Sequence, residues 1–310
     1  MIKVQHAARP VLAGLAAVLA LASCSAGVTF TPSATPAGTS GAATAVPTTP
    51  ALPPDAPPWP VTSWHYAPNN NFSHSGTYTP GAYGFNLADV AAYPKSQMDG
   101  LPDGVRGMVW IGTCQGATTD FRAIVDSFAG DPKLYGFYIT DEPTPRTCSA
   151  AHLLEEDNYI HAHAPGAKAF AILENLGNSA VPTFTGAYTP QDCGLDLIGI
   201  DPYPVRSEVT GPPRYQMIAQ YVHAVEAIGW PASSIVPVYQ TFGRSYPDDH
   251  NGFWVLPNAE QERKMLAYWA AVIPHPAFDY AYSWGAQHGD DALVESPSLQ
   301  AVFAEKNKSS

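Results

Sequence analysis

Residues 134–143 have the sequence LYGFYITDEP, in which a run of apolar and aromatic side chains leads directly into two acids. A continuous run of this length, without polar alternation, is typical of a strand buried on both faces of a parallel sheet. Two adjacent carboxylates are unusual directly after such a strand. The segment therefore predicts an α/β fold in which Asp141 and Glu142 lie at the carboxyl end of a buried strand.

Seven further short apolar or aromatic runs follow Val61, and helical patterns separate most of them. Clear helices are predicted at 151–163, 214–228 and 259–272, with a closing helix at 298–306. Eight strands in about 250 residues fit a (β/α)8 barrel better than a doubly wound sheet, whose Gly-rich first turn we do not find. The eight predicted strands are Val61–Tyr66, Gly81–Asn86, Val105–Gly112, Leu134–Thr140, Lys168–Leu173, Leu195–Ile200, Ile235–Gln240 and Phe278–Trp284.

The first sixty residues are expected to lie outside the barrel, which then occupies residues 61–310. Residues 1–23 combine a basic start, an apolar run and a small-residue end, the pattern of an export signal. The ending Leu-Ala-Ser-Cys resembles a bacterial lipobox, which implies cleavage before Cys24 and a lipid on its sulfur. Residues 24–60 are rich in Pro, Thr and Ala and predict a disordered linker. We expect a protein anchored to the outer face of a bacterial cell membrane, with plain secretion as the alternative.

Composition narrows the choice of partner. The formal net charge is -12, so a nucleic-acid partner is not expected, because binding phosphates needs a basic face. The chain holds 16 Tyr, 12 Phe and 7 Trp, whose flat faces suit neutral, hydroxyl-rich ligands. We expect a monomer that binds carbohydrate.

The acidic pair after the fourth strand is the first candidate for chemistry. Barrel enzymes place their chemistry at the carboxyl ends of the strands. A carboxyl at the rim of an apolar cavity has its pKa raised by desolvation and can act as a general acid near neutral pH. The alternative is that Asp141 caps the following helix and that Glu142 is a solvated loop residue.

With Asp-Glu-Pro after its fourth strand, the chain resembles the clan A glycoside hydrolases, barrels whose fourth strand ends in Asn-Glu-Pro with the Glu as acid/base. The resemblance implies that Glu142 protonates the glycosidic oxygen and that Asp141 replaces the Asn that contacts the 2-hydroxyl. It also implies sugar contacts from Asp201 and Tyr203 after the sixth strand. Trp284 after the eighth strand would form a platform beneath the sugar.

The sequence departs from clan A at the seventh strand, where Gln240 occupies the place of the nucleophilic Glu. Asp-Glu-Pro together with Gln-x-Phe-Gly also resembles uncharacterised bacterial barrels. An amide can hydrogen-bond a substrate but cannot form a covalent intermediate. Three possibilities stay open. Glu142 could pair with Asp201 or Glu174, at ~5 to 5.5 Å for retention or ~6.5 to 9.5 Å for inversion. Alternatively, Asp141 and Glu142 could act as in substrate-assisted hexosaminidases, or the barrel could only bind sugar.

Other side chains near the predicted strand ends are candidate sugar contacts. Trp64 and Trp110 could stack on a pyranose ring, with core packing as an equal alternative. His65 and Asn86 are placed near the site by the strand count alone.

The positions of the cysteines relative to the predicted strands indicate which of them can pair. Cys114 and Cys148 follow the third and fourth strands, so they lie on the same face and predict a disulfide in an exported protein. Cys193 precedes the sixth strand and is expected to be unpaired.

No metal or cofactor is expected. The acidic segments 247–252 and 289–291 do not fit a calcium-binding loop and are interpreted as solvated loops. His161 and His163 lie near a helix end without a third ligand in register.

These observations predict an exported, lipid-anchored glycoside hydrolase-like protein that acts on an extracellular or cell-wall polysaccharide, with Glu142 as general acid. The alternative is a non-catalytic carbohydrate-binding surface lipoprotein on the same barrel, which Gln240 favours.

Overall fold

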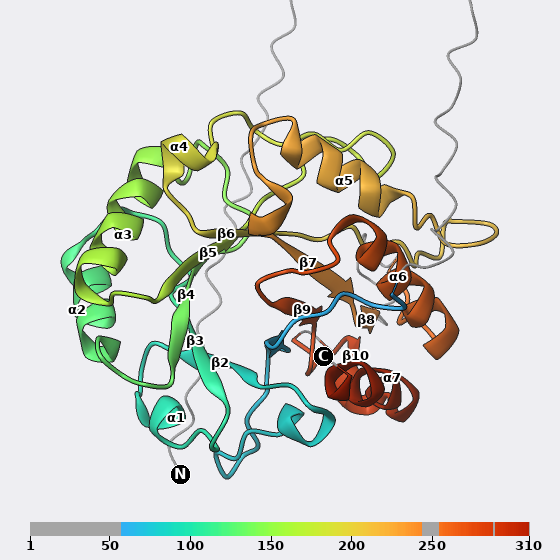
Figure 1. Ribbon diagram of the computed structural model, residues 1–310, viewed down its shortest axis with the longest axis horizontal. Coiled ribbons are helices and arrows are strands. Elements are labelled where there is room, and N and C mark those ends of the chain that lie inside the picture. Colours follow the sequence, from blue (N-terminus) through green and yellow to red (C-terminus); the bar gives the residue numbers. More distant parts are fainter. Residues whose placement is uncertain (1–56, 244–253, 288, 310) are drawn as a thin grey trace, which may run out of the picture. The chain divides into compact units, whose positions relative to one another are not determined.

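The computed structural model describes residues 57–243, 254–287 and 289–309. The predicted export signal, Cys24, most of the linker and the acidic loop 247–252 lie outside these residues. Within them, eight parallel strands close into a barrel in the order β1-β2-β3-β4-β5-β6-β7-β9, and helices surround it (Figure 1). The predicted (β/α)8 barrel is confirmed. None of the helices in the described part of the chain has the length and hydropathy needed to cross a bilayer.

The strands of the barrel are short, and each is followed by a loop at its carboxyl end. They are β1 (His65–Tyr66), β2 (Leu87–Ala91), β3 (Arg106–Trp110), β4 (Leu134–Thr140), β5 (Lys168–Ile172), β6 (Leu197–Ile200), β7 (Ile235–Gln240) and β9 (Asp279–Tyr282). Two further strands, β8 (Phe242–Gly243) and β10 (Asp291–Ala292), pair antiparallel outside the barrel.

The helices lie between the strands in sequence, except for the last 3-10 turn and the last helix, which follow β10. They are α1 (Ser96–Asp99), α2 (Thr119–Phe128), α3 (Ala150–His163), α4 (Pro190–Cys193), α5 (Met217–Glu226), α6 (Ala259–Val272) and α7 (Pro297–Lys308), with 3-10 turns η1 (Pro80–Tyr83), η2 (Ala232–Ser234) and η3 (Leu293–Glu295). At the start of α6, Asn258 and Gln261 form the expected reciprocal cap, each side chain accepting from the other residue's backbone N–H.

One predicted strand is wrong. Residues 81–86 do not form a strand, because η1 takes the first of them and β2 begins only at Leu87. The true strand has the sequence LADVA, whose Asp and Ala residues have weak β propensity. Pairing with β1 on one side and β3 on the other holds this segment extended.

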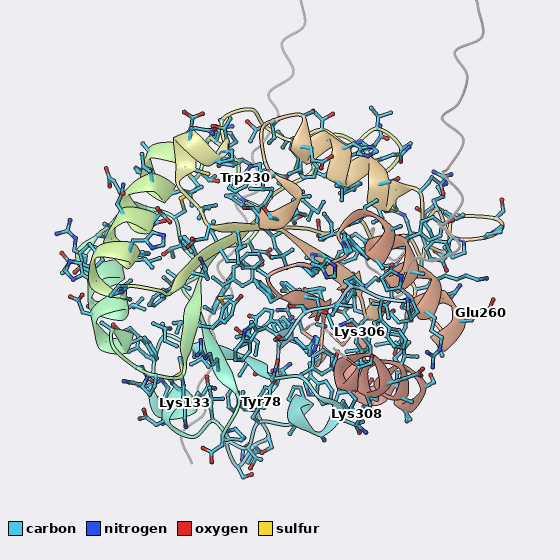
Figure 2. The ribbon with its side chains drawn as sticks, viewed as in Figure 1. Tyr78, Lys133, Trp230, Glu260, Lys306 and Lys308 are labelled. Atoms are coloured by element: carbon cyan, nitrogen blue, oxygen red, sulfur yellow. A yellow bond between two sulfur atoms is a disulfide. The ribbon has the colours of Figure 1, made fainter. Side chains whose placement is uncertain are left out.

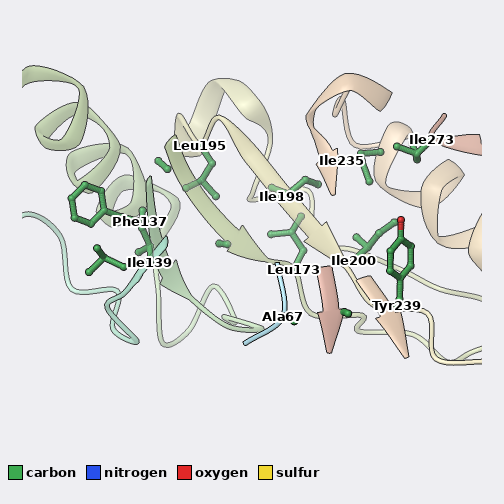
Figure 3. Packing of buried hydrophobic residues seen from close by; sticks show 14 of the residues in the cluster. Ala67, Phe137, Ile139, Leu173, Leu195, Ile198, Ile200, Ile235, Tyr239 and Ile273 are labelled. Carbon is green, nitrogen blue, oxygen red and sulfur yellow. The ribbon is translucent and has the colours of Figure 1, made fainter. Parts of the chain in front are cut away.

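The hydrophobic core has two parts. An outer layer fills the space between strands and helices and includes Phe137, Ile139 and Tyr239 (Figure 3). An inner layer fills the barrel itself, with Tyr138, Phe170, Tyr280 and other side chains that alternate with the outer ones along each strand. The interior of the barrel is therefore filled largely with aromatic rings.

A buried ionic cluster attaches the last helix to the barrel. The Lys306 ammonium of α7 is 0% exposed and bonds the Asp279 carboxylate of β9, with His65 Nδ1 3.3 Å away (Figure 2). His65 Nδ1 also lies 3.0 Å from Asp279 Oδ1. Breaking one partner of such a buried pair typically costs about 3 to 5 kcal/mol. The cluster lies on the outer side of the strands, so His65 has a structural position rather than the sugar contact we expected.

Candidate active site

A cavity of about 260 Å³ opens at the carboxyl ends of the strands. Asp141 and Glu142 reach it from the end of β4, and Asp201 from the end of β6. Asp290, which precedes β10, completes a set of four acids in its lining, beside the single cation Arg206 among the described residues. The structure thus brings together Asp141, Glu142 and Asp201, which the sequence placed after two separate strands. The interpretation of segment 289–291 as a solvated loop is wrong for Asp290, which is 8% exposed and lines the cavity.

Glu142 has an unusual backbone. Its φ is 43°, in the left-handed region that side chains other than Gly rarely adopt. Its N–H donates to Ile172 O at 3.1 Å, which fixes the turn against the end of β5. Residues held in sparsely populated conformations cluster at functional sites. The turn presents the Glu142 carboxyl to the cavity, where it is accessible to solvent.

The surroundings of Glu142 favour its protonated form. Partial desolvation raises its pKa to about 7, and the negative charges of Asp141 and Glu174 add to the effect. A carboxyl with this pKa is protonated in about half of the molecules at neutral pH and can release its proton to a leaving group. One oxygen of Glu174 is buried without a hydrogen-bond partner, although Glu174 itself does not line the cavity.

The two neighbouring aspartates are also shifted. Desolvation raises the pKa of Asp141, while the Tyr138 hydroxyl, which donates to its Oδ1 at 2.7 Å, opposes the shift. Desolvation, followed by the charges of Glu142 and Asp141, raises the pKa of Asp201 well above its usual value. Because the three carboxyls repel one another, they cannot all ionise freely near neutral pH, which is the condition for dividing acid and base roles.

A second cavity of about 140 Å³ adjoins the first and shares Asp141 and Tyr282 with it. Trp110, at the end of β3, lines it as expected, with the ring of Tyr138 4.6 Å away at its edge. Asp89 of β2 lies in the same cavity and accepts a hydrogen bond from the Tyr66 hydroxyl at 3.1 Å. Asp89 was not expected, because the sequence interpretation placed the second strand too early in the chain.

Aromatic rings form the walls between the acids. Tyr203 lines the larger cavity as expected, and its ring stacks on that of Tyr282 with centroids 6.1 Å apart. The Phe242 ring meets Tyr203 edge-on at 4.9 Å. Tyr282 has the same inward parity as Tyr280, and this alternation is a signal that could have identified it.

Gln240 does not contact the cavity, contrary to our expectation. Strand parity points it inward, but it is 0% exposed because neighbouring segments cover it. Its Oε1 accepts from Val205 N at 2.9 Å, and its Nε2 donates to Val205 O and Val255 O, both at 2.9 Å. The amide therefore ties the loop after β6 to the end of β7 and to the segment before α6.

Two further expected contacts lie at the wrong end of the barrel. The Trp64 ring packs edge-on against Tyr135 at 5.6 Å and lies beneath the Arg106 guanidinium at 5.0 Å, and both partners lie at strand beginnings. The Asn86 side chain accepts from His65 N and donates to Ser63 O. These residues precede their strands, so they close the amino end of the barrel.

Trp284 is not a platform for a sugar. It is 2% exposed and packs against Tyr83 and Phe85, outside the barrel. Tyr282, two residues earlier, occupies the cavity-facing position instead.

The predicted disulfide between Cys114 and Cys148 is present, with Cα atoms 5.3 Å apart. It joins the loop after β3 to the loop after β4, six residues beyond Glu142. The Cys148 carbonyl also accepts from the Tyr188 hydroxyl at 2.6 Å. Cys193 is buried and free.

His161 has neighbours that the sequence did not reveal. Its Nε2 lies 3.1 Å from Asp157 and 3.2 Å from Asp196, so three potential metal ligands come together. The Lys168 ammonium lies 3.1 Å from the same Asp196. These residues lie near the beginnings of β5 and β6, away from the cavity.

No family model and no curated protein matches the chain. Among solved structures, it is similar to the β-glucuronidase of Lactobacillus rhamnosus, with a TM-score of 0.52 and 10% identity over 81% of this chain and 50% of that one. The β-glucuronidase of Ruminococcus gnavus bound to a C6-substituted uronic isofagomine gives a TM-score of 0.52 and 10% identity over 80% and 50%. An endo-β-1,3-glucanase from Amycolatopsis mediterranei gives a TM-score of 0.48 and 14% identity over 78% and 98%. The chain thus spans about half the length of the glucuronidases, and its similarity to these two glucuronidase structures shows the barrel fold.

Proposed function

We propose that this protein is a glycoside hydrolase with Glu142 as its general acid. The observation that carries the proposal is the position of Glu142 at the end of β4, in a left-handed turn beside the cavity, with a pKa raised to about 7. The glycosidase barrels among the solved structures of this fold support the same class of reaction.

In the proposed reaction, the Glu142 carboxyl donates its proton to the glycosidic oxygen as the bond from that oxygen to the anomeric carbon breaks. Asp201, directly after β6, is the partner we favour, because it lines the same cavity and its charge interacts with that of Glu142. In this role Asp201 has to be ionised, so the proton of the interacting pair must be on Glu142 when the substrate reacts. It either takes a proton from the attacking water or bonds the anomeric carbon until water replaces it. Asp141 is held by the Tyr138 hydroxyl and is positioned to bind the sugar.

The test is hydrolysis of a panel of extracellular and cell-wall polysaccharides by the wild type and by Glu142→Gln. General acid catalysis typically contributes 10²- to 10⁴-fold, so we expect a rate loss in that range with unchanged thermal unfolding. Glu260→Gln is the matched control, because Glu260 lies on α6 and pairs with Lys264 on the surface. Equal rates for Glu142→Gln and the wild type would reject the acid role. Measurable affinity for a glycan without turnover by the wild type would instead support the carbohydrate-binding alternative.

We also propose that the barrel is exported and held at the outer face of the membrane by a lipid on Cys24. The basic, apolar and small-residue parts of residues 1–24 support this proposal. Mass spectrometry of the mature N-terminal peptide tests it, and an unmodified Cys24, or a mature chain that still carries residues 1–23, would contradict it.

A further inference from the structure

The cavities at the mouth of the barrel form a connected groove. The two described above share Asp141 and Tyr282. A third, of about 240 Å³, shares Asp89 and Trp110 with the second. A groove of this kind accommodates several units of a polymer rather than one small sugar.

The groove is strongly acidic. Among the described residues that line the first two cavities there is one cation, Arg206, which pairs with Glu208. The acids in the same lining are Asp89, Asp141, Glu142, Asp201 and Asp290. Burial raises the pKa of Asp89, as it does those of Asp141, Glu142 and Asp201, so only part of these carboxyls is ionised at neutral pH. A cation that enters the groove favours their ionised forms, whereas an anion is repelled by those that are ionised.

Within the described residues, the side-chain oxygens of Asp89 accept hydrogen bonds from uncharged groups. The contacts of Asp89 are the Tyr66 hydroxyl at 3.1 Å and the Asn69 N–H at 3.4 Å. Asp290 is 8% exposed, and its Oδ1 has no hydrogen-bond partner in the described part of the chain although the residue lines the larger cavity. A buried, unsatisfied carboxylate oxygen is costly, and a donor brought by the ligand would remove that cost.

We propose, on the basis of the hydrolase function above, that the substrate is a glycan with free, protonated amino groups, that is, a hexosamine polymer without N-acetylation. An ammonium group supplies three donors and a positive charge to carboxylates such as Asp290 and Asp89. The rings of Trp110 and Tyr282 offer faces to the pyranose and to the same cation.

The proposal separates this groove from two other chemistries. A uronic acid would place its own carboxylate among the acids, with Arg206 already paired to Glu208. An N-acetylated sugar would present a neutral amide with one donor and leave the charges uncompensated. A free amine also lacks the acetamido oxygen that a substrate-assisted reaction needs, so the second carboxylate must come from the protein.

Binding gives the primary test. Glucosamine and galactosamine oligosaccharides, and the same molecules after chemical N-acetylation, are titrated into Glu142→Gln by calorimetry. We expect at least about tenfold tighter binding of the free amines, a preference that weakens in 0.5 M NaCl because salt screens charges. Asp290→Asn in the same background should remove most of the preference, and Asp89→Asn is made in parallel in case one variant fails to fold. Glu260→Gln, which removes one surface charge, should keep the preference.

Equal affinities within each pair, tighter binding of the N-acetylated forms, or no binding of either form would overturn the inference. Hydrolysis by the wild type is then measured on the same molecules and on neutral glucans. Tight amine binding without hydrolysis would refute the hydrolase function and leave the ligand assignment standing. Hydrolysis without preference for amines would refute the ligand assignment and leave the hydrolase function standing.

Discussion

Replacing Gln240 with Glu tests whether the seventh strand holds a lapsed nucleophile or a structural amide. The sequence allows the first view, since a Glu at this position would restore the clan A arrangement. The structure supports the second, because the Gln240 amide is fully buried and donates to two carbonyl oxygens at 2.9 Å. We therefore expect Gln240→Glu to destabilise the fold rather than to create a retaining glycosidase.

The size of the effect follows from these contacts. The substitution places a carboxylate oxygen against the carbonyls of Val205 and Val255, so two donors are lost and like partial charges meet. An unsatisfied buried polar group costs about 1 to 3 kcal/mol, and an uncompensated buried charge about 3 to 5 kcal/mol. We expect the free energy of unfolding to fall by about 4 kcal/mol at pH 8, the middle of the range for an uncompensated buried charge.

The loss should depend on pH. Burial raises the pKa of the introduced carboxyl above its unfolded value of about 4.3, so the folded state takes up a proton that the unfolded state does not hold. The contribution of this carboxyl to the free energy of unfolding is then most favourable below about pH 4.3. It becomes less favourable as pH rises towards the folded pKa, by up to about 1.4 kcal/mol per pH unit. Gln240→Met loses the same hydrogen bonds without a charge, so the cost of that substitution should not vary with pH.

Urea unfolding, followed by tryptophan fluorescence with the disulfide intact, measures both variants at pH 5 and pH 8. If Gln240→Glu is as stable as the wild type at pH 8, the side chain at position 240 reaches solvent, and a structural role for the Gln240 amide is wrong. A retaining activity that the wild type lacks would refute it as well.

Two other predictions follow from the site and from the last helix. In the proposed reaction Glu142 must be protonated, so kcat/KM should fall tenfold per unit as pH rises above about 7. Asp141→Asn should move this limb to lower pH, because it removes a charge that raises the Glu142 pKa, and a limb that stays in place would contradict this interaction. Lys306→Met should cost about 3 kcal/mol or more of unfolding free energy in urea, because it leaves Asp279 buried without its ammonium partner. Lys308→Met, on the exposed side of the same helix, should cost under about 0.5 kcal/mol, and equal costs for the two would argue against the buried pair.

Where burial on both faces gave a strong pattern, the sequence was sufficient to predict the fold. β4 and β7 begin and end as predicted, since their runs of β-branched and aromatic residues have no competing interpretation. β2 was misplaced because the aromatic run before it has the better β propensity, whereas pairing with two neighbouring strands decides the structure. The helix α2 was missed, although its apolar residues lie on one face.

Three acids of the site, Asp141, Glu142 and Asp201, were predictable, but Asp89, Asp290 and most of the aromatic residues were not. A charge directly after a buried strand can lie only at a barrel end, so Glu142 and Asp201 were found from sequence. An aromatic ring is equally at home inside, outside or at either end of the barrel. The predicted strand ends at Trp284, but β9 ends two residues earlier, at Tyr282, and this end decides which ring faces the cavity. Local propensity does not determine where the strand ends.

The turn at Glu142 combines a left-handed backbone with three carboxyls that repel one another. Local preferences disfavour both the left-handed backbone and the close carboxyls, and these features persist only if surrounding contacts compensate for their cost. The surroundings do so from both sides: the backbone N–H of Glu142 bonds Ile172 O, and the disulfide at Cys148 ties the following loop to the loop after β3. A loop that served only to connect β4 with α3 would need neither the acids nor these constraints. The energetic cost of this turn therefore supports the proposed role of Glu142 as general acid.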